Sequence, residues 1–135
     1  MSGSTLVNIR LVHIWKKGVG VQKRLLYLSL FYGVALVVMV LSLLPIEHPS
    51  VSPNDKVNHI IAYTSLMILG YLAHRRYLWV LIGVIGWGIL IEILQGQTSY
   101  RMMSFADVVA NSAGGLLGCV VMSAIQKIRH IQTTR

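Results

Sequence analysis

Carboxylates are rare in this chain, and most of them lie in or beside strongly apolar segments. The 135 residues include four acidic ones. Asp55, Glu92 and Asp107 lie within or at the edge of apolar runs, whereas Glu47 lies in a polar connection. A carboxylate inside or bordering hydrocarbon is energetically costly and marks a functional site by default. Such groups could transfer protons, bind a ligand through hydrogen bonds or coordinate a metal.

Other polar residues accompany these carboxylates at helical spacing. His59 follows Asp55 by four residues, which places both on one helix face and favours the charged form of the imidazole. Asn111 follows Asp107 by the same interval. The complete candidate polar set consists of Asp55, Lys56, His59, Glu92, Gln95, Arg101, Asp107 and Asn111.

The two aspartates also have a structural interpretation. Ser52 and Ser104 each precede an aspartate by three residues, which is the spacing of a helix capping box, and Pro53 suits the first helical position. An anion in the first turn of a helix is favoured by about 0.3–1 kcal/mol. Capping and function are compatible here, because capping would hold each carboxylate rigid.

Glu92 has no comparable structural explanation in the sequence. It lies in the apolar stretch 89–94, near the end of a predicted helix, where the helix dipole disfavours an anion. We therefore expect Glu92 to be protonated or paired with a cation, unless it is a surface glutamate that reaches water. Gln95 follows it by three residues and shares its face. The candidate cations are Lys56, His59 and Arg101.

The composition indicates a membrane protein. Hydrophobic residues make up 55% of the chain and charged residues 12%, about half the usual charged share. The net charge of +8 could suggest nucleic-acid binding. The basic residues, however, cluster between and beyond apolar runs that are too long for a small soluble fold. We therefore expect membrane lipids, and not nucleic acid, as partners.

Four apolar runs approach the length of about 20 residues that a spanning helix needs. The first run is longer than a signal-peptide core, and no small-residue cleavage pattern follows it, so we expect it to be retained. The runs are 25–44, 57–73, 78–94 and 105–125. The sequence thus predicts an all-α integral membrane bundle of four transmembrane helices. This domain, 25–125, would be flanked by basic tails at 1–24 and 126–135.

The distribution of lysine and arginine predicts the orientation. Ten of the 12 lie in the N-terminal segment, the connection between the second and third runs, and the C-terminal tail. The other two connections carry only Lys56 and Arg101. The positive-inside rule then places both termini in the cytoplasm and the polar set near the extracytoplasmic face of a multi-pass protein of the bacterial inner membrane. The N-terminal segment could lie along the inner surface or be disordered.

Glycines predict which helix faces pack together. In the fourth run, Asp107, Asn111, Gly114 and Gly118 form one stripe, and small residues in such a stripe let helices approach closely in lipid. The stripe should therefore face protein. The third run has three glycines that could act in the same way, Gly83, Gly86 and Gly88.

Sequence motifs for common enzyme chemistry are absent. The chain has no nucleophile elbow, P-loop, HExxH or CxxC motif. The acidic residues and His59 show no compact metal-ligand spacing, so we expect neither a metal nor a cofactor. Arg101, Lys56 and His59 could contact a phosphate, and the carboxylates could accept hydrogen bonds from sugar or amine groups.

The ordered polar set resembles the pattern of the VanZ-like family over about residues 30–125. The matching segments read DKVNH, EILQG and RMMSFADVVANSAGG. The resemblance implies a small multi-spanning protein of the bacterial cell envelope, whose polar set is a family signature. The namesake of the family accompanies glycopeptide-resistance genes and confers low-level resistance to teicoplanin. The resemblance does not imply antibiotic resistance for this chain.

Three hypotheses of function follow. The first is a non-enzymatic envelope protein whose polar site binds a lipid headgroup, a cell-wall precursor or a lipophilic glycopeptide. The second is a membrane-embedded enzyme acting on a phospholipid or polyprenyl phosphate, with Glu92 or Asp107 as general base and Arg101 holding the phosphate. The third is a small proton-coupled transporter with Glu92 as its protonatable group, which would need oligomers.

Overall fold

The protein is an all-α molecule of four helices within the residues that the structure describes. The structure is a computed structural model that describes the backbone of residues 3–45 and 53–134 and the side chains of residues 20–45 and 55–134. No strand occurs in these ranges, which confirms the all-α part of the predicted fold class. The helices are α1 (Gly3–Leu43), α2 (Pro53–His74), α3 (Tyr77–Gln95) and α4 (Phe105–Thr133).

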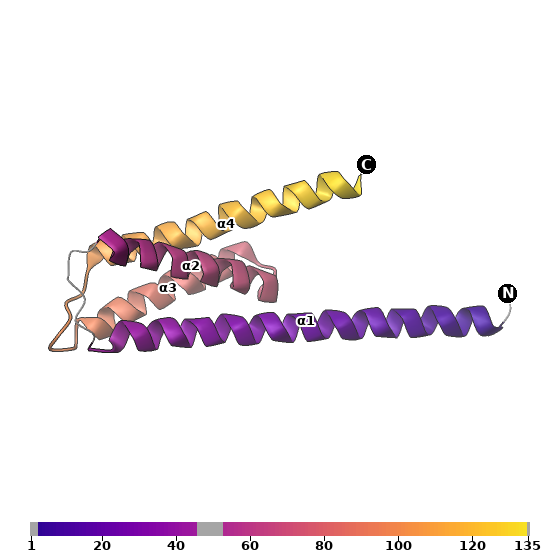
Figure 1. Ribbon diagram of the computed structural model, residues 1–135, viewed down its shortest axis with the longest axis horizontal. Coiled ribbons are helices and arrows are strands. Elements are labelled where there is room, and N and C mark those ends of the chain that lie inside the picture. Colours follow the sequence, from indigo (N-terminus) through magenta and orange to yellow (C-terminus); the bar gives the residue numbers. More distant parts are fainter. Residues whose placement is uncertain (1–2, 46–52, 135) are drawn as a thin grey trace.

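The four helices run alternately up and down, with α2 at the centre of the bundle (Figure 1). α2 contacts each of the other three helices, most extensively α4. The N-terminal end of α1 and the C-terminal end of α4 lie at the same end of the bundle, which is also the end of the α2–α3 turn (Figure 1). The start of α2, the end of α3 and the start of α4 therefore meet at the opposite end.

The N-terminal segment differs from our expectation. α1 begins at Gly3 and continues without interruption to Leu43. The segment before residue 25 therefore continues the first apolar helix, instead of forming a separate surface helix or an irregular tail. Helical hydrogen bonding needs no apolar side chains, so the helix can extend beyond the apolar run that the sequence pattern detects.

Three of the four predicted spans are long and apolar enough to cross a membrane. These are the segments Gly20–Leu43, Tyr77–Gln95 and Phe105–Thr133. α2 has 22 residues, a length of about 33 Å, but is less apolar. Its first two turns hold most of its polar residues, and much of its remaining surface is buried against the other helices. Such a central helix needs less apolar surface than one facing lipid on most sides.

Glycines in α4 allow α2 and α4 to pack closely, which agrees with the prediction that this stripe faces protein. A Cβ atom added at Gly114 would lie 2.6 Å from the Ile60 carbonyl oxygen, and one at Gly118 would lie 2.6 Å from the Met67 Cβ. Only hydrogen atoms fit into these gaps. Thr64 Oγ1 also donates a hydrogen bond of 3.0 Å to the Gly114 carbonyl oxygen. The predicted glycine stripe is therefore the α2–α4 contact.

Only one of the three glycines suggested for α3 has this role. A Cβ atom at Gly88 would lie 2.9 Å from the Tyr63 ring and 3.0 Å from Asn111 Nδ2. Gly83 and Gly86 have open space in the Cβ direction, so the prediction was wrong for these two. They lie on the exposed side of α3, whereas Gly88 lies on its buried face.

Candidate functional site

The first turns of α2 place Asp55 and His59 side by side. α2 begins at Pro53 with Asp55 in its first turn; the predicted N-cap, Ser52, lies outside the described residues. His59 Nε2 lies 3.9 Å from Asp55 Oδ1, and Arg101 Nη2 lies 4.0 Å from Asp55 Oδ2. Both distances are at the long limit for ion pairs. The carboxylate is thus flanked by an arginine from the α3–α4 connection and by a histidine one turn away.

The start of α4 is capped from two directions. Ser104 is the N-cap, and its side chain accepts a hydrogen bond of 3.3 Å from the backbone N–H of Asp107. This half of the predicted capping box is confirmed. The backbone N–H of Ser104 donates a 3.0 Å hydrogen bond to Glu92 Oε2, a group on α3. In a capping box, the acid three residues after the N-cap accepts this hydrogen bond from the N-cap backbone. Here Glu92 accepts it in place of Asp107, so the Asp107 carboxylate does not cap the helix.

Glu92 therefore has a structural role that its sequence did not indicate. Its side chain is completely buried, at 0% exposure. Among the described residues it makes no ion pair, so of the two expected alternatives, a cation partner or a protonated carboxyl, the structure does not show the first. Its partner is the N-terminus of α4, whose unsatisfied N–H groups carry partial positive charge. Glu92 Oε1 has no hydrogen-bond partner among the described residues.

His59 also connects α2 to α4. Its Nδ1 atom lies 2.8 Å from Asn111 Oδ1. Asn111 is buried, with 2% of its surface exposed. With the amide oxygen as acceptor, Nδ1 carries the proton and the Nε2 atom faces Asp55. The ring is thereby fixed between an amide on α4 and a carboxylate on its own helix.

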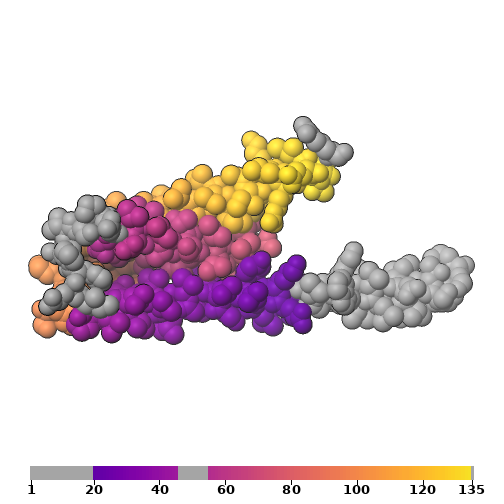
Figure 2. All heavy atoms as spheres, viewed as in Figure 1, coloured from indigo at the N-terminus to yellow at the C-terminus, as the bar shows by residue number. Residues whose placement is uncertain are grey.

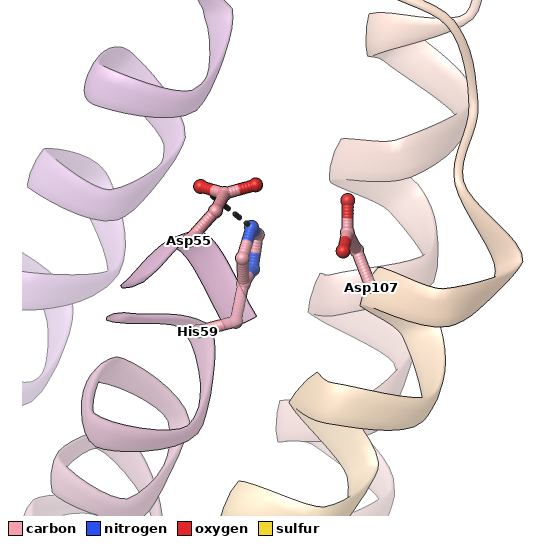
Figure 3. A group of neighbouring side chains, drawn as sticks. All are labelled: Asp55, His59 and Asp107. Carbon is pink, nitrogen blue, oxygen red and sulfur yellow. Dashed lines mark ion pairs between the residues drawn. The ribbon is translucent and has the colours of Figure 1, made fainter. Parts of the chain in front are cut away.

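Asp55, His59 and Asp107 form a compact cluster at the α2–α4 contact. Figure 3 shows Asp55 and His59 on α2 facing Asp107 at the start of α4. One potential ligand atom from each residue lies within 4.8 Å of the others. Asp107 is 9% exposed, and no hydrogen bond to its carboxylate is recorded within the described ranges. Such a set could exchange protons or hold a divalent cation. The three side chains come from two helices, so the sequence shows no compact metal-ligand spacing.

A pocket of ≈ 340 Å³ opens beside this cluster, between α1, α2 and the α3–α4 connection. One side is apolar and includes Val38 and Leu41 of α1. The other side is polar and carries charges of both signs. We call this cavity the outer pocket; its full lining is Val38, Leu41, Ser42, Asp55, Asn58, His59, Ala62, Tyr63 and Arg101.

The α3–α4 connection is held against the end of α1. Gln95 Nε2 and Arg101 Nη1 donate hydrogen bonds of 2.8 and 3.1 Å to the Ser42 carbonyl oxygen, and Tyr100 Oη donates one of 2.6 Å to that of Leu43. The last carbonyls of a helix lack partners within it. The three side chains satisfy the last carbonyl groups of α1. The hydrogen bond of Arg101 also fixes its side chain in the lining of the outer pocket.

The predicted polar set therefore divides by position. Asp55, His59 and Arg101 line the outer pocket, and Asp107 and Asn111 lie next to it. Glu92 and Gln95 instead hold helix ends together. Lys56 is exposed and does not line the outer pocket, because one residue along a helix turns it about 100° away from Asp55.

The structure adds pocket residues that the sequence analysis did not select. Ser42, Asn58 and Tyr63 line the outer pocket, and the buried Tyr63 hydroxyl has no hydrogen-bond partner among the described residues. Asn58 lies three residues after Asp55, so helical spacing could have identified it. Ser42 accepts hydrogen bonds from Gln95 and Arg101 through its backbone carbonyl oxygen. Every residue has such a carbonyl group, so the sequence does not single out Ser42.

Comparison with known proteins identifies one relationship. A family model described as VanZ/LLP1 matches residues 8–126, which include all four helices in whole or in large part. The match includes every residue of the candidate polar set. No curated protein and no solved structure matches the chain.

Proposed function

The chain belongs to the VanZ/LLP1 family, and from this premise and the outer pocket we propose that it binds the polar end of a lipid-like molecule of the bacterial cell envelope. The ligand classes that fit are a lipid headgroup, a cell-wall precursor and a lipophilic glycopeptide. The last class would agree with the link of the family to teicoplanin resistance.

In this proposal the protein is a multi-pass protein of the cytoplasmic membrane with four spans. Three helices are apolar enough to span, and α2, enclosed by them, is long enough. Arg75 and Arg76 form the turn between α2 and α3, which lies at the same end of the bundle as the start of α1 and the end of α4 (Figure 1). The positive-inside rule makes this end cytoplasmic and directs the outer pocket to the extracytoplasmic face.

The observation that carries the proposal is the mixed lining of the outer pocket. Val38, Leu41 and Ala62 provide apolar contact surface, whereas Asp55 and Arg101 provide charges of opposite sign. An amphiphile with a charged or zwitterionic headgroup satisfies both kinds of lining at once. Arg101 and His59 could bind a phosphate or carboxylate, and Asp55 an amine or hydroxyl donor. Ligand pockets commonly combine apolar walls with a few converging polar groups.

A membrane-embedded enzyme is the second candidate, and the orientation of His59 favours it. A histidine fixed by Asn111 and flanked by Asp55 and Asp107 has the arrangement of a general base, with Arg101 as the phosphate-binding group. The substrate would be a phospholipid or polyprenyl phosphate. Glu92 is the weaker choice for the base, because Oε2 accepts the Ser104 N–H.

One set of variants tests both candidates. The full-length protein and its Asp55→Asn, Arg101→Gln and Lys56→Gln variants are expressed to equal membrane abundance and purified in mild detergent. Mass spectrometry then compares the lipids that co-purify and the lipids of the whole membrane. Lys56→Gln is the matched control, because it removes an exposed charge near the outer pocket.

For a binding protein, we expect a co-purifying lipid-like species that is lost from Asp55→Asn and Arg101→Gln but kept by Lys56→Gln. For an enzyme, we expect the lipids of the whole membrane to change with wild-type protein and with Lys56→Gln only. If all four proteins give the same result in both measurements, the outer pocket has neither function.

A further inference from the structure

A second cavity lies at the opposite end of the bundle from the outer pocket. It has a volume of ≈ 770 Å³ and lies between α1, the α2–α3 turn and α4. Figure 2 shows the molecule hollowed here between α1 and α4, with the turn at the base. We call this cavity the basic recess; its lining is Gly20, Lys23, Arg24, Tyr27, Ile68, Leu72, Ala73, His74, Arg75, Arg76, Met122, Ile125 and Arg129.

The basic recess collects positive charge from three separate elements. Lys23 and Arg24 come from α1, Arg75 and Arg76 from the α2–α3 turn, and Arg129 from α4. No aspartate or glutamate lines the cavity. Within the described side chains, both recorded ion pairs involve Asp55, at the other end of the molecule. Among the described residues, the five cations of the recess therefore have no carboxylate partner.

The backbone of the turn adds an independent observation. Arg75 has φ = 60°, in the left-handed region where glycine is the usual residue after a helix. A non-glycine residue in this region costs of order 1 kcal/mol or more, and such strain is concentrated at functional positions. The Arg75 guanidinium lies 5.8 Å from the centre of the Tyr71 ring, beside the recess. The α2–α3 turn is therefore strained at Arg75, and the side chain of this residue lines the basic recess.

Apart from Tyr27 and His74, the rest of the lining is apolar, and these apolar residues come from the helices. Ile68, Leu72 and Ile125 are among them. A free anion would use only the charged rim, whereas a phospholipid would place its phosphate at the rim and its acyl chains along these side chains. Basic pockets between membrane helices on the cytoplasmic side commonly bind anionic headgroups.

We propose that the basic recess binds the phosphate headgroup of an anionic phospholipid. This site is separate from the outer pocket, so the proposal does not depend on the function assigned there. A bound phosphate would offset the repulsion among the cations and connect α1 to α4, two helices whose backbones do not approach each other closely within the described residues.

Native mass spectrometry of the full-length protein in a non-ionic detergent tests the proposal. Phosphatidylglycerol and phosphatidylcholine with identical acyl chains are added at equal concentration, and the fraction of protein carrying each lipid is measured. A double variant, Arg75→Gln with Arg129→Gln, removes two lining cations. Its matched control, Lys56→Gln with Lys127→Gln, removes the same charge from exposed positions outside the recess.

We expect binding of phosphatidylglycerol to exceed that of phosphatidylcholine. Each cation near a lipid surface contributes about fivefold, so the Arg75/Arg129 variant should bind phosphatidylglycerol roughly 25-fold more weakly. The control double variant should retain nearly wild-type binding. Equal loss in the two double variants, or equal binding of the two lipids by wild type, overturns the proposal.

Two further measurements separate the site from misfolding and from a free-anion site. Arg75→Gly removes the guanidinium and relieves the left-handed strain, so it should weaken binding about fivefold without lowering thermal stability. Unchanged binding in this variant would contradict the role of the turn. Inorganic phosphate should fail to displace the lipid at millimolar concentration; complete displacement would show a site for free phosphate and refute the lipid proposal.

Discussion

The glycine contact between α2 and α4 gives a prediction whose magnitude follows from the structure. In Gly118→Ala, the new methyl group would lie 2.6 Å from the Met67 Cβ and 2.9 Å from the Thr64 carbonyl oxygen. Carbon atoms in contact lie about 3.5–4.0 Å apart, so α2 and α4 must separate locally by roughly 1 Å. Both obstructing atoms belong to or adjoin the backbone and cannot move aside by a rotamer change.

Overpacking of this kind typically costs 1–3 kcal/mol. Replacing glycine by alanine within a helix is favourable by roughly 0.5–1 kcal/mol, which offsets part of that cost. We expect Gly118→Ala to be destabilised by about 1–2 kcal/mol. Gly83→Ala is the matched control, because open space surrounds its Cβ direction, and it should be unchanged or slightly more stable.

Thermal unfolding in detergent, followed by circular dichroism, measures both variants under one condition. The midpoint of Gly118→Ala should fall by several degrees relative to that of Gly83→Ala. A Gly118→Ala protein as stable as Gly83→Ala would refute the close α2–α4 contact, and with it the arrangement that brings Asp107 beside His59.

Substitutions at three other positions test contacts at the end of the bundle where α4 begins, each by the same unfolding measurement. Glu92→Gln keeps an acceptor for the Ser104 N–H, so its stability should remain within about 1 kcal/mol of wild type. Glu92→Leu leaves that donor unsatisfied and should lose about 1–3 kcal/mol of stability. Equal stability of the two variants would exclude the helix-capping role of Glu92. Ser104→Ala should lose about 0.5–2 kcal/mol, and Ser104→Asp, which can still cap, should recover most of it. Tyr100→Phe removes the hydrogen bond to the Leu43 carbonyl and should lose about 0.5–1.5 kcal/mol; no loss would mean that this contact does not hold the connection to α1.

Local sequence patterns predicted the helices and their local contacts. The four apolar runs correspond to the four helices, and the end of each run lies close to a helix end except at the outermost ends of α1 and α4. The Asp55–His59 pair and the Ser104 cap depend only on spacing along one helix, and both are present. Such features follow from the geometry of the helix itself.

Contacts between distant segments could not be predicted in the same way. Glu92 was expected to be protonated or to pair with a side-chain cation, and the partner that the structure shows is the backbone N–H of Ser104. Every residue except proline has such a donor, so the sequence does not distinguish it. Lys56 was included because its place in the sequence puts it at the same end of the bundle as Asp55, although neighbouring residues on a helix point in different directions. The pocket wall from α1 depends on how the bundle closes, which no local pattern specifies.

The central claim is that the outer pocket holds a lipid-like ligand, and photo-crosslinking inside living cells tests it most directly. Leu41→p-benzoylphenylalanine places a crosslinker in the pocket wall, and Val40→p-benzoylphenylalanine places one on a neighbouring exposed position outside the lining. After irradiation, mass spectrometry identifies the crosslinked species. Our account predicts a distinct amphiphile at Leu41 that is absent at Val40 and is lost when Arg101→Gln is added. The same bulk lipids at both positions, unaffected by Arg101→Gln, would contradict it.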